Sequence, residues 1–279
     1  MKTFLPNLII IGAPKCGTSS MHFYLGQHPQ IYMSQPKELN FFQLEKNWDK
    51  GEMWYRSHFK KQAMIRGESS PMYSNAFEFS DVPERMHALI PDARLIYLMR
   101  DPIQRIISHH VHAAAVGLSS GSIEECLNSP NNNYVQYSQY YIQLKHYLKY
   151  FALSQICIIT SEDLYISRYK TLQQIFRFLE VDPAYYSSQF TTLKNTYADI
   201  SPKSAFARYL DSVTNHNIRF LIPETMRSAI RKMIFSRFKD RVAKPILNDR
   251  LKSQLMNFLK DDINQLRVLT NQKFEKWCL

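Results

Sequence analysis

An apolar run that leads into a glycine-bracketed turn, at residues 8–20, constrains the fold of this chain more than any other segment. Residues 8–11 have the β-branched composition of a buried strand, and a helix is expected over residues 18–27. Between them, Gly12 and Gly17 bracket a turn in which backbone N–H groups can converge beside the positive end of the helix. The segment therefore predicts a strand–turn–helix unit that binds a phosphate-type anion.

The position of the lysine in this turn restricts the class of nucleotide that can bind. The two glycines are spaced as in the nucleotide-binding P-loop, but Lys15 lies inside the turn, and Thr18 follows Gly17 where a lysine would be expected. A lysine after the turn reaches the β- and γ-phosphates, whereas Lys15 is expected beside the first phosphate group and whatever is bonded to it. The spacing thus favours a nucleotide with one 5′-phosphate-type group over a triphosphate.

Short apolar runs alternate with helical patterns over most of the chain, which predicts an α/β fold with a parallel sheet covered by helices on both faces. The expected strands are 8–11, 31–33, 64–68, 94–99 and 156–159. The expected helices are 18–27, 48–59, 81–90, 102–116, 134–151, 172–179 and an apolar stripe over 251–266. Asp81 and Glu84 form a capping-box pattern at the start of the third helix. Since we find no linker, we expect a P-loop-like, three-layer fold in a single domain, residues 1–279.

Charge and cysteine content restrict the function classes. The formal net charge of +11 predicts an anionic ligand, cofactor or polymer. The basic residues are scattered, without an arginine-rich arm or zinc-finger spacing, so nucleic acid is not the expected partner. The four cysteines form no CxxC pair, which predicts reduced thiols and neither a metal site nor a disulfide framework. We find no signal peptide and no apolar run of roughly 18 residues, and expect a soluble, cytoplasmic protein.

Two further polar segments follow predicted strands, and open α/β sheets bind ligands at the carboxyl ends of their strands. Arg100 directly follows the fourth strand, and Ser108 lies two turns into the next helix. Such a pair can hold a second phosphate, the guanidinium through charge-assisted hydrogen bonds. The other segment, Lys37-Glu38, places a carboxylate after the second strand.

Together these motifs resemble those of the sulfotransferases that use 3′-phosphoadenosine 5′-phosphosulfate (PAPS). Pro14-Lys15-Cys16-Gly17-Thr18 is similar to the PKxGT-type loop that binds the 5′-phosphosulfate, and Arg100 with Ser108 is similar to the 3′-phosphate site. Residues 37–42 (Lys-Glu-Leu-Asn-Phe-Phe) look like the KExxFF segment of the glycan-modifying branch, whose glutamate is the catalytic base. Further similar segments are residues 68–73, 82–85, 162–164 and 178–179 and the closing stretch with Trp277.

The resemblance implies a PAPS-dependent sulfotransferase that acts on a hydroxyl of a carbohydrate. Glu38 is then expected to remove the acceptor proton, and Lys15 to stabilise the departing phosphate oxygen. Phe41 and Phe42 are expected to exclude water beside Glu38 and raise its basicity. The family's late basic loop would fall at Lys203, where this chain departs from the expected pattern. The residues expected to bind the cosubstrate are Lys15, Cys16, Gly17, Thr18, Ser19, Ser20, Arg100 and Ser108, and no metal is implied.

Alternative interpretations of these residues stay open. The acceptor is alternatively a lipid, polyketide or other small-molecule alcohol, and a P-loop kinase would share the phosphate-binding turn but not the position of its lysine. Arg100 would pair with Asp101 if it had only a structural role. His110 or His112 is the substitute base if Glu38 does not serve. The tyrosine-rich helix is expected to pack on its neighbours rather than on sugar rings, and the oligomeric state stays open.

Overall fold

The protein is described by a computed structural model that covers residues 4–60, 62–119, 121–128, 133–192 and 244–279. In these residues five strands form one sheet in the order β2-β3-β1-β4-β5. Their bounds are Leu8–Gly12 (β1), Ile31–Met33 (β2), Ile65–Ser69 (β3), Arg94–Met99 (β4) and Ile156–Thr160 (β5). Each predicted strand is confirmed to within one residue at either end.

All strand pairs are parallel, so the carboxyl ends of the five strands lie along one edge of the sheet. β1 is the central strand, and its Leu8 lies opposite Gly67 of β3 and Arg94 of β4. Every residue of β1 is buried, as expected for a parallel strand covered on both faces. This strand therefore brings the loop that follows it to the middle of the carboxyl edge.

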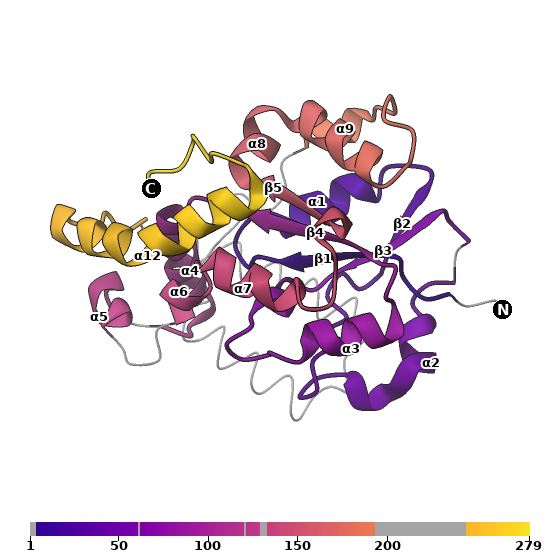
Figure 1. The fold of residues 1–279 in the computed structure, drawn as a ribbon, viewed down its shortest axis with the longest axis horizontal. Helices are drawn as coiled ribbons and strands as arrows, with labels where there is room; N and C mark the ends of the chain where they lie inside the picture. The colour runs from indigo at the N-terminus through magenta and orange to yellow at the C-terminus, as the bar shows by residue number, and fades with distance from the viewer. Residues whose placement is uncertain (1–3, 61, 120, 129–132, 193–243) are drawn as a thin grey trace, which may run out of the picture.

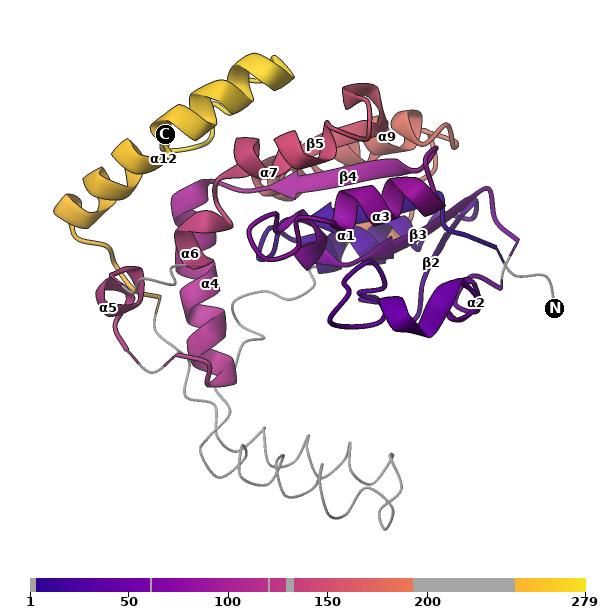
Figure 2. The same cartoon turned by 60° about the horizontal axis from the view of Figure 1, so that its bottom comes forward.

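Helices cover both faces of the sheet. In Figure 1, α1, α8 and α9 lie on one side of it, and α2 and α3 lie on the other, which confirms the predicted three-layer α/β fold. Figure 2 shows the long C-terminal helix α12 beside α4 and α7, at the end of the molecule away from the N-terminus. The described helices are α1 (Thr18–Leu25), α2 (Gly51–Arg56), α3 (Val82–Leu89), α4 (Pro102–Val116), α5 (Ile123–Leu127), α6 (Asn133–Gln136), α7 (Tyr140–Tyr147), α8 (Ser161–Ile166), α9 (Arg168–Phe178) and α12 (Asp249–Thr270).

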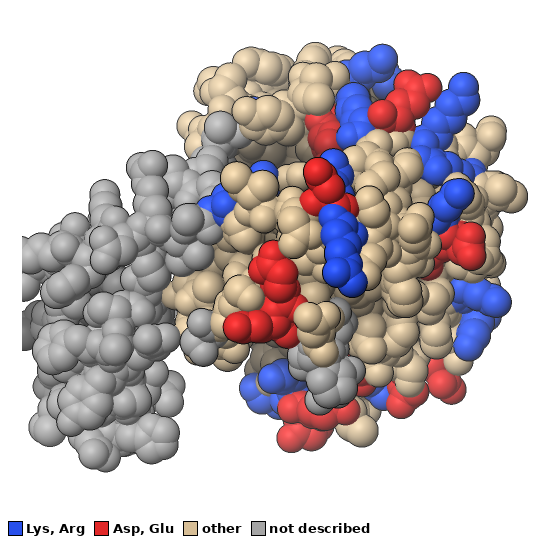
Figure 3. Space-filling view, turned by 90° about the vertical axis from the view of Figure 1, so that its left-hand side faces the viewer, with Lys and Arg blue, Asp and Glu red and all other residues tan. Residues whose placement is uncertain are grey.

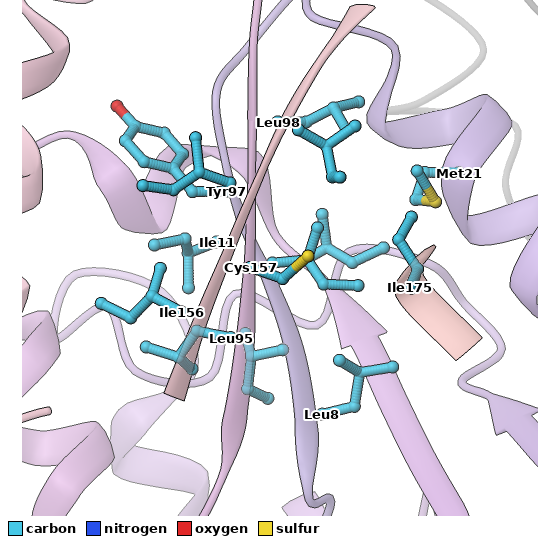
Figure 4. Close-up of a cluster of buried hydrophobic side chains, with 14 of the residues drawn as sticks. Leu8, Ile11, Met21, Leu95, Tyr97, Leu98, Ile156, Cys157 and Ile175 are labelled. Atoms are coloured by element: carbon cyan, nitrogen blue, oxygen red, sulfur yellow. The ribbon is translucent and has the colours of Figure 1, made fainter. Parts of the chain in front are cut away.

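Apolar side chains fill the space between the sheet and its helices. Figure 4 shows Ile11 and Tyr97 on one side of the strands, and Met21, Leu98 and Ile175 on the other. All five are fully buried, and burial of a large apolar side chain contributes about 1.5–3 kcal/mol. The predicted apolar stripe of α12 also belongs to the core, since its residues Leu255, Leu259, Ile263 and Leu266 are buried.

The start of α4 is fixed by Asp101. Its carboxylate accepts a hydrogen bond from the backbone N–H of Gln104 at 2.8 Å and another from that of Cys278 at 2.6 Å, and Pro102 occupies the first helical position. No ion pair joins Asp101 to Arg100, so the structural interpretation of Arg100 as its partner is wrong. Asp101 instead orients the helix that carries Ser108.

The predicted helix over residues 134–151 is divided into α6 and α7. The division follows from Asp262 of α12, whose two carboxylate oxygens accept the backbone N–H groups of Tyr141 and Ile142, each at 3.0 Å. These are first-turn groups of α7 that a continuous helix would bond internally. Burial raises the pKa of Asp262 to about 6. Tyr140 and Tyr147 are buried, which confirms the expected packing of the tyrosine-rich segment.

Two other details of the sequence analysis are wrong. The predicted helix 48–59 is divided at Gly51, whose φ of 74° ends a 3-10 turn before α2 begins. The capping box of Asp81 and Glu84 does not form, because Asp81 has a helical backbone and caps no N–H group with its side chain. Its carboxylate lies 3.7 Å from the guanidinium of Arg85 instead.

Charges of both signs are interspersed on the face shown in Figure 3, where no continuous basic stripe is visible. Across the described parts of the chain, no helix is both long enough and apolar enough to cross a bilayer. All four cysteines are unpaired. Lys203, where the family's late basic loop was expected, and most of residues 184–246 lie outside the described residues.

Candidate active site

A cavity of about 910 Å³ lies over the carboxyl edge of the sheet, where open α/β sheets bind ligands. Segments that follow all five strands contribute to its wall, together with α4. The nine residues predicted from the sequence to bind the cosubstrate or to be catalytic all line this cavity: Lys15, Cys16, Gly17, Thr18, Ser19, Ser20, Glu38, Arg100 and Ser108. Residues from four separate segments of the chain thus meet at one place.

The loop between β1 and α1 presents an uncapped helix N-terminus to the cavity. Gly17 is the N-cap residue, with φ 95°, and it has no side chain that could accept the first N–H groups of α1. At Gly12, an added Cβ would lie 2.1 Å from Oγ of Ser74, so only glycine fits there. The N–H groups at this helix start, which no side chain caps, and the helix dipole make this loop suited to an anion.

Cys16 contributes its backbone to the loop, and its side chain is not available to a ligand. Its side chain is fully buried, and its Sγ lies 3.7 Å from the hydroxyl of Tyr140. Burial raises the pKa of this thiol to about 11, so it is neither a nucleophile nor an anion at neutral pH. The same Tyr140 hydroxyl donates to the backbone carbonyl of Arg100 at 2.8 Å. One buried phenol therefore links the loop after β1 to the end of β4.

Lys15, in the loop after β1, and Arg100, directly after β4, are two cations that line the cavity. Burial, with a smaller contribution from the positive charge of Arg100, lowers the pKa of Lys15 to about 8, and the negative charge of Glu38 partly opposes this change. Within the described part of the chain, neither Lys15 nor the guanidinium of Arg100 has a salt-bridge partner. Ser108, on α4, is nearly buried at the wall of the same cavity. Two unpaired cations beside a helix N-terminus create a site for a multiply charged anion.

Glu38 is exposed at the cavity, whereas its aromatic neighbours along the chain are buried in the core. Its side chain is 48% exposed and forms an ion pair of 2.6 Å with Lys37. Phe41 is buried with its ring stacked on that of Tyr55, at a centroid distance of 4.1 Å, and Phe42 is fully buried as well. The expectation that these two rings shield Glu38 from water is therefore wrong. They anchor the segment in the core and leave Glu38 at the cavity.

A buried carboxylate, which the sequence analysis did not identify, holds this segment in place. Glu68, the second-last residue of β3, accepts a hydrogen bond from the hydroxyl of Tyr73 at 2.8 Å and another from that of Ser70 at 3.3 Å. The Ser70 hydroxyl accepts the backbone N–H of Asn40 at 3.0 Å, and the Tyr73 hydroxyl that of Phe42 at 3.3 Å. Burial raises the pKa of Glu68 to about 7. Through these bonds the end of β3 fixes the backbone just after Glu38.

The three histidines of α4 do not share one surface. His109 and His112 line the cavity, but His110 does not, and it is buried with its Nδ1 unbonded by any described residue. His112 is therefore the only one of the two suggested substitute bases that reaches the cavity. The charges of Lys15 and Glu38 both act on the pKa of His112, which burial lowers.

Arg168 lines the cavity but had no recognisable signal in the sequence. Arg168 of α9 stacks its guanidinium on the ring of Tyr24, 5.2 Å from the centroid, and donates to the carbonyl of Phe190 at 2.6 Å. The remaining lining residues that no named segment of the sequence analysis contained are Ser161, Tyr165 and Ile166. Those that such segments did contain are Pro14, Lys37, Pro71, Met72, Tyr137, Glu162 and Leu164. In the described ranges no group of three or more His, Cys, Asp or Glu side chains is arranged to hold a metal ion.

An open parallel sheet with a glycine loop after its central strand, and two cations at its carboxyl edge, defines a phosphate-binding α/β protein of the P-loop-like class. The comparison with known families is more specific. Residues 5–250 match the profile of the sulfotransferase domain. The chain therefore belongs to the sulfotransferase family.

Curated relatives agree with this assignment. The chain is 27% identical over 274 residues to the bifunctional heparan sulfate N-deacetylase/N-sulfotransferase 1 of Caenorhabditis elegans, covering 90% of this chain and 31% of that protein. It is 28% identical over 208 residues to human heparan sulfate glucosamine 3-O-sulfotransferase 5, covering 69% of this chain and 59% of that protein. The chain thus spans less than two thirds of the length of these relatives.

Solved structures share the fold. A sulfotransferase from Alicyclobacillus acidocaldarius superposes with a TM-score of 0.71 at 22% identity, covering 98% of this chain and 99% of that one. A sulfotransferase domain from the curacin biosynthetic pathway gives a TM-score of 0.51 at 14% identity, covering 93% of this chain and 99% of that one. At these identities the likeness is one of architecture.

Proposed function

We propose that this protein transfers the sulfuryl group of PAPS to a hydroxyl of a carbohydrate acceptor. The observation that carries the proposal is the meeting of two anion-binding segments, the loop of residues 13–18 and the pair Arg100 and Ser108, in one cavity that also holds Glu38. PAPS is a single molecule with a phosphosulfate and a separate 3′-phosphate. A cavity of about 910 Å³ is large enough for this nucleotide and part of an acceptor, since ligand pockets measure roughly 300–1,000 Å³.

Each residue has a defined part in the proposed reaction. The N–H groups at the start of α1 hold the 5′-phosphate, and Arg100 and Ser108 hold the 3′-phosphate. Glu38 takes the proton of the acceptor hydroxyl while the acceptor oxygen forms a bond to sulfur. The bond between sulfur and the bridging oxygen breaks, and its electron pair stays on the 5′-phosphate, where Lys15 stabilises the negative charge. The products are a sulfate ester and adenosine 3′,5′-bisphosphate.

The acceptor class rests on the relatives and on residues 37–42. Both curated relatives described above are named as heparan sulfate enzymes, and the segment with Glu38 is similar to the glycan-modifying branch. A lipid, polyketide or other small-molecule alcohol is the second candidate, favoured by Tyr165 and Ile166, which line the cavity with 70% and 65% of their surface exposed. A kinase is not supported, because the residue after Gly17 is Thr18 and not lysine.

The direct test is transfer of radiolabelled sulfate from PAPS across a panel of glycans, lipids and small alcohols. We expect label in a carbohydrate product and equimolar release of adenosine 3′,5′-bisphosphate. Label in an alcohol or lipid alone would move the acceptor to the second candidate. Greater thermal stabilisation by ADP or ATP with magnesium than by adenosine 3′,5′-bisphosphate would contradict the proposed cosubstrate.

The charge of Lys15 predicts an alkaline limit of activity. Its pKa is about 8 in the free protein, so Lys15 is protonated below that pH and loses its charge above it. Because the pH dependence of kcat/KM reports groups of the free enzyme, kcat/KM for PAPS is expected to fall as the pH rises through about 8. In Lys15→Arg the guanidinium stays charged, so this fall is expected to disappear at whatever rate remains. An unchanged alkaline fall in the variant would assign it to another group.

The left-handed conformation of Gly17 predicts a combined loss of stability and binding. An L-residue at its φ of 95° costs about 1–2 kcal/mol, so Gly17→Ala is expected to lower the free energy of unfolding by that amount. The strained loop also misaligns its N–H groups, so affinity for adenosine 3′,5′-bisphosphate is expected to fall. Gly51→Ala is the matched control, because Gly51 has φ 74° with no atom near an added Cβ. Equal nucleotide affinities in the two variants would contradict the role of the loop.

A further inference from the structure

Arg105 of α4 is a fully buried cation that the proposed reaction does not use. Its Nε donates to the hydroxyl of Ser138 at 2.6 Å, and one terminal nitrogen donates to the backbone carbonyl of Tyr134. No salt bridge to Arg105 exists among the residues that the structure covers. Its positive charge is therefore buried without a carboxylate beside it, next to the wall of the cavity.

The remaining terminal nitrogen of Arg105 lies 3.4 Å from Nδ1 of His109. A guanidinium has donors and no acceptor, so Nδ1 must present its lone pair, and the proton of a neutral imidazole then resides on Nε2. The ring is held in orientation by two tyrosines, stacked on Tyr137 at 5.5 Å and tilted against Tyr134 at 4.4 Å. His109 is thus fixed in position and in tautomer.

His109 is also held in its neutral form. Burial lowers its pKa to about 3, and the positive charges of Arg105 and Lys15 act in the same direction, followed by His112 and His110. His109 lines the cavity, and its Nε2 bonds to no other described residue. Since Nδ1 is directed at the buried Arg105, Nε2–H is the donor that His109 has left for the cavity, uncharged over the working pH range and within electrostatic reach of Lys15.

We propose that His109 is a neutral N–H donor to an anionic oxygen at the sulfuryl end of the bound cosubstrate, fixed in that role by Arg105. The assignment rests on the proposed function, because it requires PAPS in this cavity. The buried guanidinium polarises the imidazole toward the cavity, so that Nε2–H is a stronger donor than an isolated histidine would provide. A neutral donor binds the sulfuryl oxygens without offering a proton that the departing phosphate could take.

The experiment measures the affinities of PAPS and of adenosine 3′,5′-bisphosphate, without acceptor, for the whole protein and its variants. His109→Phe keeps an aromatic ring between the two tyrosines and removes the donor. His109→Gln restores an N–H group of similar reach. His87→Phe is the matched control, since His87 also packs against aromatic rings, those of Tyr150 and Phe151, outside the cavity. A thermal melt of each variant reports whether it is folded.

We expect His109→Phe to weaken PAPS binding about tenfold, the loss typical of one hydrogen bond to a charged group. Binding of adenosine 3′,5′-bisphosphate is expected to stay within twofold, and His109→Gln is expected to recover most of the lost affinity for PAPS. An equal loss for both nucleotides would place His109 at the adenosine or phosphate groups and overturn the assignment. No loss in the Phe variant, or no recovery in the Gln variant, would overturn it as well. If the unaltered protein binds neither nucleotide, the proposed function fails together with this inference.

Discussion

Glu38→Gln is expected to lower the turnover of PAPS by about 10²–10⁴-fold, the usual contribution of a general base. The carboxylate lies at the cavity with Lys37 as its ion-pair partner, and a glutamine of the same shape cannot accept the acceptor proton. Affinity for adenosine 3′,5′-bisphosphate is expected to stay within twofold, because Glu38 contacts neither phosphate in the proposed reaction. Turnover is measured by release of that product, and affinity by calorimetry.

Glu45→Gln provides the control for this substitution. Glu45 is an exposed glutamate a few residues further along the same loop and does not line the cavity. It is expected to keep its full turnover. A Glu38→Gln variant that retains turnover would contradict the base assignment, and His112, which reaches the cavity, would be the next residue to substitute.

Arg100→Ala is expected to weaken adenosine 3′,5′-bisphosphate by about a hundredfold, corresponding to about 2–3 kcal/mol for charge-assisted bonds to a phosphate. Adenosine 5′-phosphosulfate lacks the 3′-phosphate, so its affinity is expected to change less than threefold. The selectivity of the protein for the 3′-phosphorylated nucleotide is therefore lost. Calorimetry with both nucleotides measures the two affinities.

Arg177→Ala tests whether loss of any arginine has this effect. Arg177 is an exposed cation at the end of α9, outside the cavity. Both nucleotides are expected to bind to this variant with unchanged affinity. An equal loss of both nucleotides in Arg100→Ala would show that Arg100 acts on the general field of the cavity and not on the 3′-phosphate.

Much of the fold could be predicted because its strands are buried on both faces. Apart from Arg94 at the start of β4, the residues of β1 and β4 are apolar without alternation, and such runs between helical patterns are typical of a parallel sheet. The helix boundaries were less predictable where distant residues decide them. Asp262 caps α7 from a position 121 residues away from Tyr141, and no local pattern of residues 134–151 indicates this contact.

The candidate site could be predicted where it depends on local motifs. The loop with Lys15 and the pair of Arg100 and Ser108 were found because their spacing along the chain carries the chemistry. Their supporting contacts were missed because these join different segments, as in the bond between Arg105 and Tyr134 across 29 residues.

One prediction was wrong because it relied on residues that are close together in the sequence. Phe41 and Phe42 follow Glu38 closely along the chain, but both rings lie in the core. Glu38 remains half exposed at the cavity. Neighbours along an irregular segment need not face the same way, so the sequence cannot decide which of its side chains is shielded from water.

The central claim is that two separate segments hold the two phosphates of one nucleotide, and a crystal structure with adenosine 3′,5′-bisphosphate tests it most directly. The account predicts the 5′-phosphate on the N–H groups of residues 17–19, at the start of α1. It predicts the 3′-phosphate on the guanidinium of Arg100 and the hydroxyl of Ser108 in the same complex. A bound nucleotide that leaves either of these two places without a phosphate would contradict it.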